Sequence, residues 1–142
     1  MKHSILIVLS LISFSVLASD PEIEITKIWD DAPHNAFTDL IRHNGMFYCT
    51  FREGTGHVPG ETGEDGKIRI LSSESGKKWE SLALLAKKDY DLRDSKLSAT
   101  PDGRLMVLMG GSNYDGNHLL NRLTHVSFFE EKENTFSQPQ PI

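Results

Sequence analysis

The most constraining feature of this sequence is the regular alternation of short apolar runs with turn-forming residues. The apolar runs are four to seven residues long, and no stretch of twelve residues keeps a helical period with capping residues. This pattern predicts an all-β fold. The predicted strands are 24–29, 37–43, 46–51, 67–72, 79–85, 96–100, 105–109 and 124–129.

Two dipeptides and one long segment define the predicted connections. Asn44-Gly45 and Asp102-Gly103 each predict a two-residue hairpin, because both central positions of such a turn require positive φ. The segment 54–66 holds five glycines and one proline, which predicts a long exposed loop. Long loops on rigid β scaffolds often carry function.

The first eighteen residues have the form of an export signal. A short polar start at Lys2 and His3 precedes a 13-residue run, 5–17, that only serines interrupt, and Ala18 ends a group of small residues. The run is shorter than the ~20 residues that a membrane-spanning helix needs. We therefore expect cleavage after Ala18, a secreted or periplasmic product spanning 19–142, and no membrane attachment after cleavage. The alternative is an N-terminal membrane anchor.

Composition excludes several classes of protein and partner. With 15 Lys and Arg against 20 Asp and Glu, the net charge is −5, which disfavours nucleic acid and anionic membrane surfaces as partners. Cys49 is the only cysteine, so no intrachain disulfide can form. Because Cys49 shares a predicted strand face with Phe47 and Phe51, we expect a buried thiol rather than a nucleophile.

The sequence also contains an internal repeat. The hairpin glycines Gly45 and Gly103 are 58 residues apart, and Trp79 and Phe136, which end the two copies, are 57 apart. Two four-stranded units, about 24–85 and 91–142, are therefore predicted, in the pattern of β-propeller blades. Two blades cannot close a ring, so we expect the chain to be the N-terminal portion of a longer protein. The alternative is a complete β-sandwich.

One turn resembles a motif of a known family. The stretch SSESGKKW, residues 72–79, resembles the Asp box of bacterial neuraminidases, with matching positions Ser72, Glu74, Gly76 and Trp79. The stretches HNAFTDLI, FYCTFREGTGH and DLRDSKLSATPDGRLMVL are also similar to the N-terminal part of secreted sialidase-like proteins. The resemblance implies a six-bladed propeller and an exo-glycosidase that removes terminal sugars such as sialic acid.

The resemblance also implies roles for particular residues. Sialidases bind the sugar carboxylate with arginines and use an aspartate as acid/base beside a Tyr–Glu nucleophile pair. The candidates for catalytic or charge-binding residues here are Arg52, Glu53, Asp39, Arg93 and Asp94, and those for substrate contact are His57 and His34. Each has a structural alternative: a surface arginine for Arg52, an ion pair or turn for Arg93 and Asp94, a strand-edge acid for Asp39, and plain solvation for the histidines.

The remaining motifs indicate no cofactor. The histidines lack paired zinc spacing, and Asp89, Asp91 and Asp94 lack the glycine and distal glutamate of a calcium-binding loop. We therefore expect neither a metal nor a nucleotide. Two functional hypotheses remain: an exported sialidase-type glycosidase with a glycan substrate, and a non-catalytic Asp-box propeller that binds carbohydrate or protein.

Overall fold

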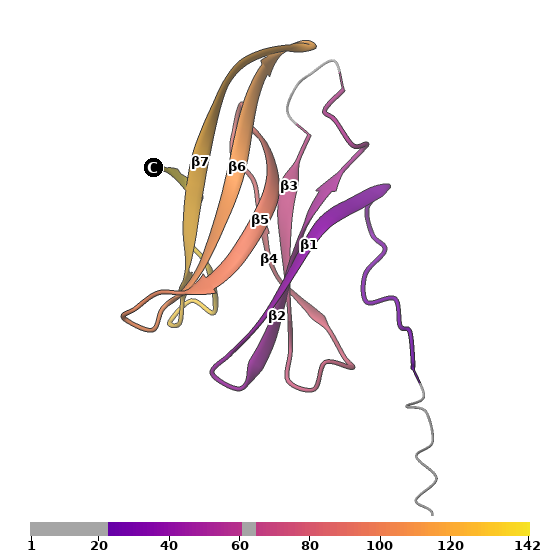
Figure 1. Cartoon of the computed structure of the whole chain (residues 1–142), viewed down its shortest axis with the longest axis vertical. Helices are drawn as coiled ribbons and strands as arrows, with labels where there is room; N and C mark the ends of the chain where they lie inside the picture. Colours follow the sequence, from indigo (N-terminus) through magenta and orange to yellow (C-terminus); the bar gives the residue numbers. More distant parts are fainter. Residues whose placement is uncertain (1–22, 61–64) are drawn as a thin grey trace, which may run out of the picture.

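The protein folds as two antiparallel β-sheets built from consecutive strands (Figure 1). The computed structural model describes residues 23–60 and 65–142. Sheet 1 has the order β1 (His34–His43), β2 (Met46–Gly54), β3 (Lys67–Ser73) and β4 (Glu80–Leu85). Sheet 2 contains β5 (Asp91–Ala99), β6 (Leu105–Asp115), β7 (His118–Glu130) and β8 (Thr135–Phe136), and β9 (Gln140–Pro141) also pairs with β7. The predicted all-β class is confirmed, and the described residues include no helix of a length and apolarity that could cross a membrane.

The two sheets pack face to face on one hydrophobic core. We call the face of sheet 1 that carries Tyr48, Ile68 and Ile70 its front face, and the face of sheet 2 that carries Leu97 and Val107 its back face. These side chains belong to a single buried cluster, so the front of sheet 1 contacts the back of sheet 2. The remaining buried members of this cluster are Ala83, Leu85, Leu92, Leu105, Met109 and Phe136.

The back face of sheet 1 has a second, smaller cluster. Cys49, Phe51 and Leu71 alternate with the front-face residues, and they are covered by Ile28, Trp29 and Trp79. Alternation along β2 therefore buries side chains on both faces of sheet 1. The predicted burial of Cys49 is confirmed.

Corresponding irregularities show that the two sheets are copies of one plan. The β1–β2 register shifts between Ala36 and Asp39, and the β5–β6 register shifts between Arg93 and Lys96. Each shift contains one non-glycine residue with positive φ, Phe37 (62°) in β1 and Asp94 (52°) in β5. The turns after β3 and β7 also correspond, since Gly76 (φ 75°) and Asn134 (φ 49°) both adopt the left-handed region. The internal repeat inferred from the sequence is thus present in the backbone.

One predicted hairpin is confirmed and the other is wrong in length. Asn44 and Gly45 both have positive φ, as a two-residue turn requires. In the second hairpin only Gly103 does, and the Gly103 amide donates to Thr100 O (2.8 Å) while the Thr100 amide donates to Arg104 O (2.9 Å). Because Pro101 fixes a negative φ, the chain makes a type I turn first and places the glycine after it. The connection is a three-residue loop.

The prediction of a strand over 24–29 is wrong. Residues 23–32 form no strand, and Ile23 and Ile25 are 82% and 92% exposed. The apolar alternation there has no neighbouring strand to pair with, and the segment is instead held across the back of sheet 1 by Ile28 and Trp29. The expected export signal, 1–18, lies outside the described residues.

Two strands extend well beyond their predicted ends. β6 continues to Asp115 and β7 begins at His118, so the pair projects as a long hairpin with a turn at Gly116. The residues from Ser112 to His118 are mostly polar and give no apolar alternation. Backbone pairing alone, from Ser112↔Arg122 to Asp115↔His118, extends this arm.

Candidate functional site

Most of the predicted catalytic and substrate-contact residues lie toward one end of the two sheets, whereas Asp39 lies in the middle of β1. We call this end the loop end; it comprises residues 54–60 and 65–66, the starts of β1 and β5 and the β6–β7 turn (Figure 1). The opposite end, the hairpin end, holds the turns at Gly45, Gly76, Gly103 and Asn134. Because every strand runs antiparallel to its neighbour, alternate connections gather at each end.

A single carboxylate joins two arginines at the loop end. Arg52 Nε and Nη2 both donate to Asp91 Oδ1, at 3.1 and 2.7 Å, and both side chains are fully buried. The other oxygen, Oδ2, accepts from Arg93 Nε (2.8 Å) and also from Arg93 Nη2. Arg52 comes from sheet 1, whereas Asp91 and Arg93 come from sheet 2, so the network ties the sheets together electrostatically.

Glycines make room for this network. A Cβ at Gly66 would lie 2.1 Å from Asp91 Oδ1 and 2.6 Å from Arg52 Nε, closer than any side chain can approach. The Gly66 carbonyl also accepts from the Leu92 amide (2.9 Å), a backbone bond between the two sheets. The residue just before β3 therefore has to be glycine for β5 to approach this closely.

The described ends of the 54–66 segment, residues 54–60 and 65–66, are joined to each other by hydrogen bonds. Asp65 Oδ2 accepts from the Thr55 amide (2.8 Å) and the Thr55 hydroxyl (2.7 Å), and Arg52 Nη1 donates to Gly56 O (2.7 Å). Partial burial alone would raise the pKa of Asp65, but the Thr55 hydrogen bonds and the Arg52 charge outweigh it and lower that pKa. These ends are thus held by an ionised carboxylate.

A hollow beside this network carries two arginines. It has a volume of about 360 Å³ and is lined by Arg93, Asp94, Gly110 and Arg122 together with Gly111, Ser112, Leu123 and Thr124. Arg93 retains 17% side-chain exposure, so the arginine that Asp91 orients also borders solvent. Gly110 corresponds to Arg52 in the repeat, and its missing side chain opens the space. Two guanidinium groups beside a hollow suit an anionic ligand such as a carboxylate.

The two predicted substrate-contact histidines lie together. The rings of His34 and His57 are 5.8 Å apart, and Phe37 lies 5.6 Å from His57. His34 Nδ1 is buried without a hydrogen-bond partner among the described residues. The positive φ of Phe37 is strained for an aromatic residue, and it directs this side chain toward His57.

Two of the predicted acids are engaged in structural contacts. Glu53 accepts from Arg69 Nε (2.8 Å) and Nη2 (3.0 Å) and from Trp29 Nε1 (2.6 Å), so it anchors the N-terminal segment to sheet 1. Asp39 Oδ2 accepts from the Leu97 amide (2.8 Å), a second bond between the sheets. Among the predicted acids, Asp94 is the one that lies exposed at the hollow.

The turn that resembles an Asp box is closed by Ser73 and not by the predicted Ser72. Ser73 Oγ accepts from the Gly76 amide (2.9 Å), and Trp79 Nε1 donates to Gly76 O (2.9 Å). Trp79 packs against Cys49, Phe51 and Leu71, as expected, whereas Glu74 is exposed. Gly76 provides the positive-φ corner. The motif therefore positions the indole and lies at the hairpin end, away from the arginine hollow.

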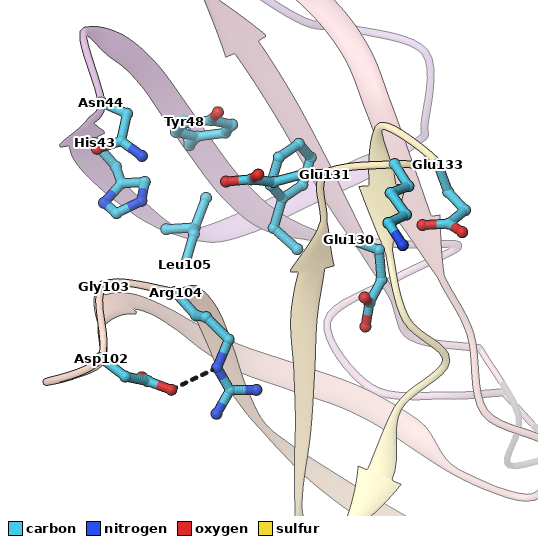
Figure 2. A pocket seen from close by; sticks show the side chains of 12 residues that line it. His43, Asn44, Tyr48, Asp102, Gly103, Arg104, Leu105, Glu130, Glu131 and Glu133 are labelled. Carbon is cyan, nitrogen blue, oxygen red and sulfur yellow. Dashed lines mark hydrogen bonds and ion pairs between the residues drawn. The ribbon is translucent and has the colours of Figure 1, made fainter.

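A larger cavity lies at the hairpin end and holds none of the predicted catalytic residues. It has a volume of about 790 Å³ and lies between the β1–β2, β5–β6 and β7–β8 turns (Figure 2). Three glutamates, Glu130, Glu131 and Glu133, lie along one side, and Arg104, paired with Asp102, lies on another. Burial, and then the charge of Glu131, raise the pKa of Tyr48, so this phenol stays protonated. We see no arrangement of nucleophile and base there.

Sequence reasoning missed three contributors to the loop end. Asp91 was considered only as an ion ligand, although its position two residues before Arg93 was a usable signal. Asp65 belongs to the 54–66 segment, which also contains Glu61 and Glu64, and no sequence motif singles out one of these three acidic residues. Arg122 precedes the predicted strand 124–129 and joins Arg93 only because β7 is longer than expected.

The described residues contain no group of three or more His, Cys, Asp or Glu side chains that could hold a metal ion. Comparison of this chain with protein-family models, with curated proteins and with solved structures gives no match.

Proposed function

We propose that the two sheets are two blades of a sialidase-like β-propeller and that the protein is an exported glycoside hydrolase acting on glycans with an anionic terminal sugar. The observation that carries the proposal is the arginine hollow at the loop end. Arg93 is oriented there by Asp91, which is itself held by the buried Arg52, and Arg122 and Asp94 share the hollow.

The chemistry of this hollow fits a charged sugar. A carboxylate accepts paired hydrogen bonds from a guanidinium, and an arginine whose rotamer is already fixed loses little entropy on binding. Asp94 is an exposed carboxylate beside these arginines, and acid/base chemistry on a glycosidic bond requires such a group. In this assignment Arg52 supports Arg93 from below and does not contact the substrate.

The repeat supports the blade interpretation. Consecutive antiparallel strands, corresponding bulges at Phe37 and Asp94 and a tryptophan-anchored turn at Gly76 are features expected of successive propeller blades. The packing of the front of one sheet on the back of the next also agrees with this architecture.

The test is release of a fluorogenic sialoside by the secreted protein. We expect turnover by the wild type, a loss of about 10²–10⁴-fold for Asp94→Asn, and a raised KM for Arg93→Lys, because lysine cannot make the paired contact. Arg42→Lys, an exposed arginine near the β1–β2 turn, is the matched control and should leave both kcat and KM unchanged. Turnover that survives Asp94→Asn would reject the acid/base role.

The second candidate is a propeller that binds glycans without hydrolysing them. It is favoured by the engagement of Arg52, Glu53 and Asp39 in structural contacts, since three of the five predicted catalytic residues are used to hold the fold. A protein that is inert on sialosides and other glycosides, yet binds a sialoside with an affinity that Arg93→Lys lowers, would establish this candidate.

A further inference from the structure

The cavity at the hairpin end combines an aromatic floor with an acidic rim. Tyr48 and Leu105, which belong to the common core cluster, form its floor together with Phe129, which packs against that cluster. The rings of Tyr48 and Phe129 are 6.1 Å apart and inclined at 57°, so they form two adjoining sides. The cavity therefore offers a ligand both apolar surface and aromatic faces (Figure 2).

The rim of this cavity carries negative charge that its other lining residues leave uncompensated. Glu130, Glu131 and Glu133 follow one another closely at the β7–β8 turn, and all three are exposed. Lys132 is the single lysine among them, and none of the three glutamates forms an ion pair with a residue that lines the cavity (Figure 2). Because like charges this close repel one another, a cation in the cavity would be stabilised by them.

The arginine at the rim does not supply this cation. Arg104 Nε donates to Asp102 Oδ2 (2.9 Å), and the guanidinium carbon of Arg104 lies 4.4 Å from the centre of the Phe128 ring. Because side chains alternate along β7, Phe128 lies on the front of sheet 2, whereas Phe129 faces the core and the cavity. Arg104 is thus held on the outer side, and the glutamates remain available to another partner.

Tyr48 supplies a polar group that no described residue bonds. Tyr48 is 7% exposed, and none of the hydrogen bonds among the described residues includes its hydroxyl. In the described part of the chain, the fully buried side-chain nitrogens and oxygens without a partner are those of His34 and His125, so the Tyr48 hydroxyl opens into the cavity. Burial, and then the charge of Glu131, raise the pKa of Tyr48, which places that carboxylate near the phenol. A phenol buried to this degree usually has a hydrogen-bond partner, and a ligand in the cavity would supply it.

We propose that this cavity binds a primary alkylammonium ligand. The ammonium group lies between the Glu131 carboxylate and the Tyr48 hydroxyl, donates to both, and rests against the faces of the Tyr48 and Phe129 rings. The alkyl chain covers Leu105. A primary ammonium fits better than a quaternary one, because only the former can donate a hydrogen bond to the phenol oxygen. None of these residues borders the arginine hollow, so the proposal does not depend on the proposed function.

Isothermal titration calorimetry with hexylammonium chloride tests the proposal. Sodium hexanoate, which has a six-carbon chain and the opposite charge, is the control ligand. We expect the wild type to bind hexylammonium at low ionic strength with a dissociation constant of about 1 mM or less. The affinity should fall as added salt screens the glutamates. Hexanoate should give no measurable heat of binding.

Two substitutions change the cavity and a third is the matched control. Glu131→Gln should weaken hexylammonium binding at least about tenfold, because it removes the charged acceptor, and Tyr48→Phe about fivefold, because it removes the hydroxyl and keeps the ring. Glu80→Gln changes an exposed acid at the start of β4, outside this cavity, and should bind as the wild type does. Circular dichroism confirms folding, and Glu131→Gln, at an exposed position, keeps the test decisive should Tyr48→Phe not fold.

Three results would overturn the binding site: a wild type that does not bind hexylammonium, equal binding of hexanoate, or an unchanged affinity in Glu131→Gln. An unchanged affinity in Tyr48→Phe, or equal binding of hexyltrimethylammonium, would overturn the role of the phenol and with it the preference for a primary ammonium.

Discussion

The single carboxylate of Asp91 neutralises two arginines. Both of its oxygens are used, one by Arg52 and the other by Arg93, and its own side chain is fully buried. Buried charges are costly unless paired, so each arginine depends on this carboxylate. Asp65, 3.9 Å from Arg52 Nη2, adds a second negative charge near the buried guanidinium.

Replacing Asp91 with asparagine should therefore destabilise the protein severely. We expect a loss of about 3–5 kcal/mol in the free energy of unfolding, because the buried Arg52 would lose its hydrogen-bonded carboxylate and keep only Asp65, 3.9 Å away, as a counter-charge. Urea denaturation measures this loss. The control is Asp30→Asn, which breaks the exposed Lys27–Asp30 pair and should change stability by less than about 1 kcal/mol. Similar small effects for both variants would show that the buried pair contributes little.

Cys49 should be unreactive in the folded protein. Burial, and then the charge of Asp39, raise the pKa of its thiol to about 11, so almost no thiolate exists near pH 8. We expect a chromogenic disulfide reagent to react slowly with the native protein and rapidly in urea. Complete reaction within minutes without denaturant would contradict this.

Because the pKa of Cys49 is raised in the folded protein, the free energy of unfolding should depend on pH in the alkaline range. The unfolded thiol loses its proton first, near its ordinary pKa, while the folded thiol keeps its proton up to about 11. Folding stability from this group is thus constant below the unfolded pKa and falls as the pH rises between the two values.

The sequence was enough to select residues that lie at the loop end, but it did not reveal what each of these residues does there. Arg52 was expected at the substrate because it ends a strand beside a glycine-rich loop. The structure buries Arg52 against Asp91, which is 39 residues away, and no local pattern reveals that pairing. Burial of the Cys49 thiol was predictable because it depends only on alternation along one strand.

At the scale of elements, predictions were accurate where a strand has one apolar face and a definite turn. β1 to β4 end within a few residues of expectation, and the Asn44-Gly45 hairpin formed as its residues require. The 24–29 segment failed because alternation shows that a strand could form, but not that a partner strand is nearby. The β6–β7 arm was missed because backbone pairing, which leaves no mark in hydrophobicity, extends it.

Gly66 is the position at which β3 and β5 depend most on a small residue. A Gly66→Ala substitution would force a Cβ to within 2.1 Å of Asp91 Oδ1, and Leu92 O would lie 2.4 Å away. We expect a loss of at least about 2–3 kcal/mol, because overpacking would displace the carboxylate from Arg52. Thermal unfolding measures this loss. Gly60→Ala, where no other atom of the described residues lies within 4 Å of the new Cβ, should have little effect, and equal stability of the two variants would argue against the close approach.

At the scale of the whole molecule, the two sheets share one core and should unfold together. Both tryptophans, Trp29 and Trp79, lie on the back of sheet 1, so fluorescence reports sheet 1 alone. Leu97, in sheet 2, packs in the common cluster. Leu97→Ala should lower stability by about 2–5 kcal/mol, and the tryptophan transition should shift by the same amount as circular dichroism.

Leu119→Ala is the control, because Leu119 lies on the exposed β6–β7 arm outside the common cluster. Tryptophan fluorescence that is unmoved by Leu97→Ala would mean that the sheets unfold separately. The single core across both sheets could not be read from the sequence, because periodicity shows which face of a strand is apolar but not which other face covers it.

The corresponding bulges at Phe37 and Asp94 have a consequence for how such a gene can change. The two positions are 57 residues apart, and the hairpin glycines Gly45 and Gly103 are 58 apart. The bulge and the hairpin turn of a sheet therefore recur at nearly the same interval. Duplication or deletion of a DNA segment of that length would add or remove a whole sheet with its bulge and its hairpin turns in register. Recombination at any other interval would misalign the bulge with its strand, so this architecture should lengthen or shorten only in whole modules.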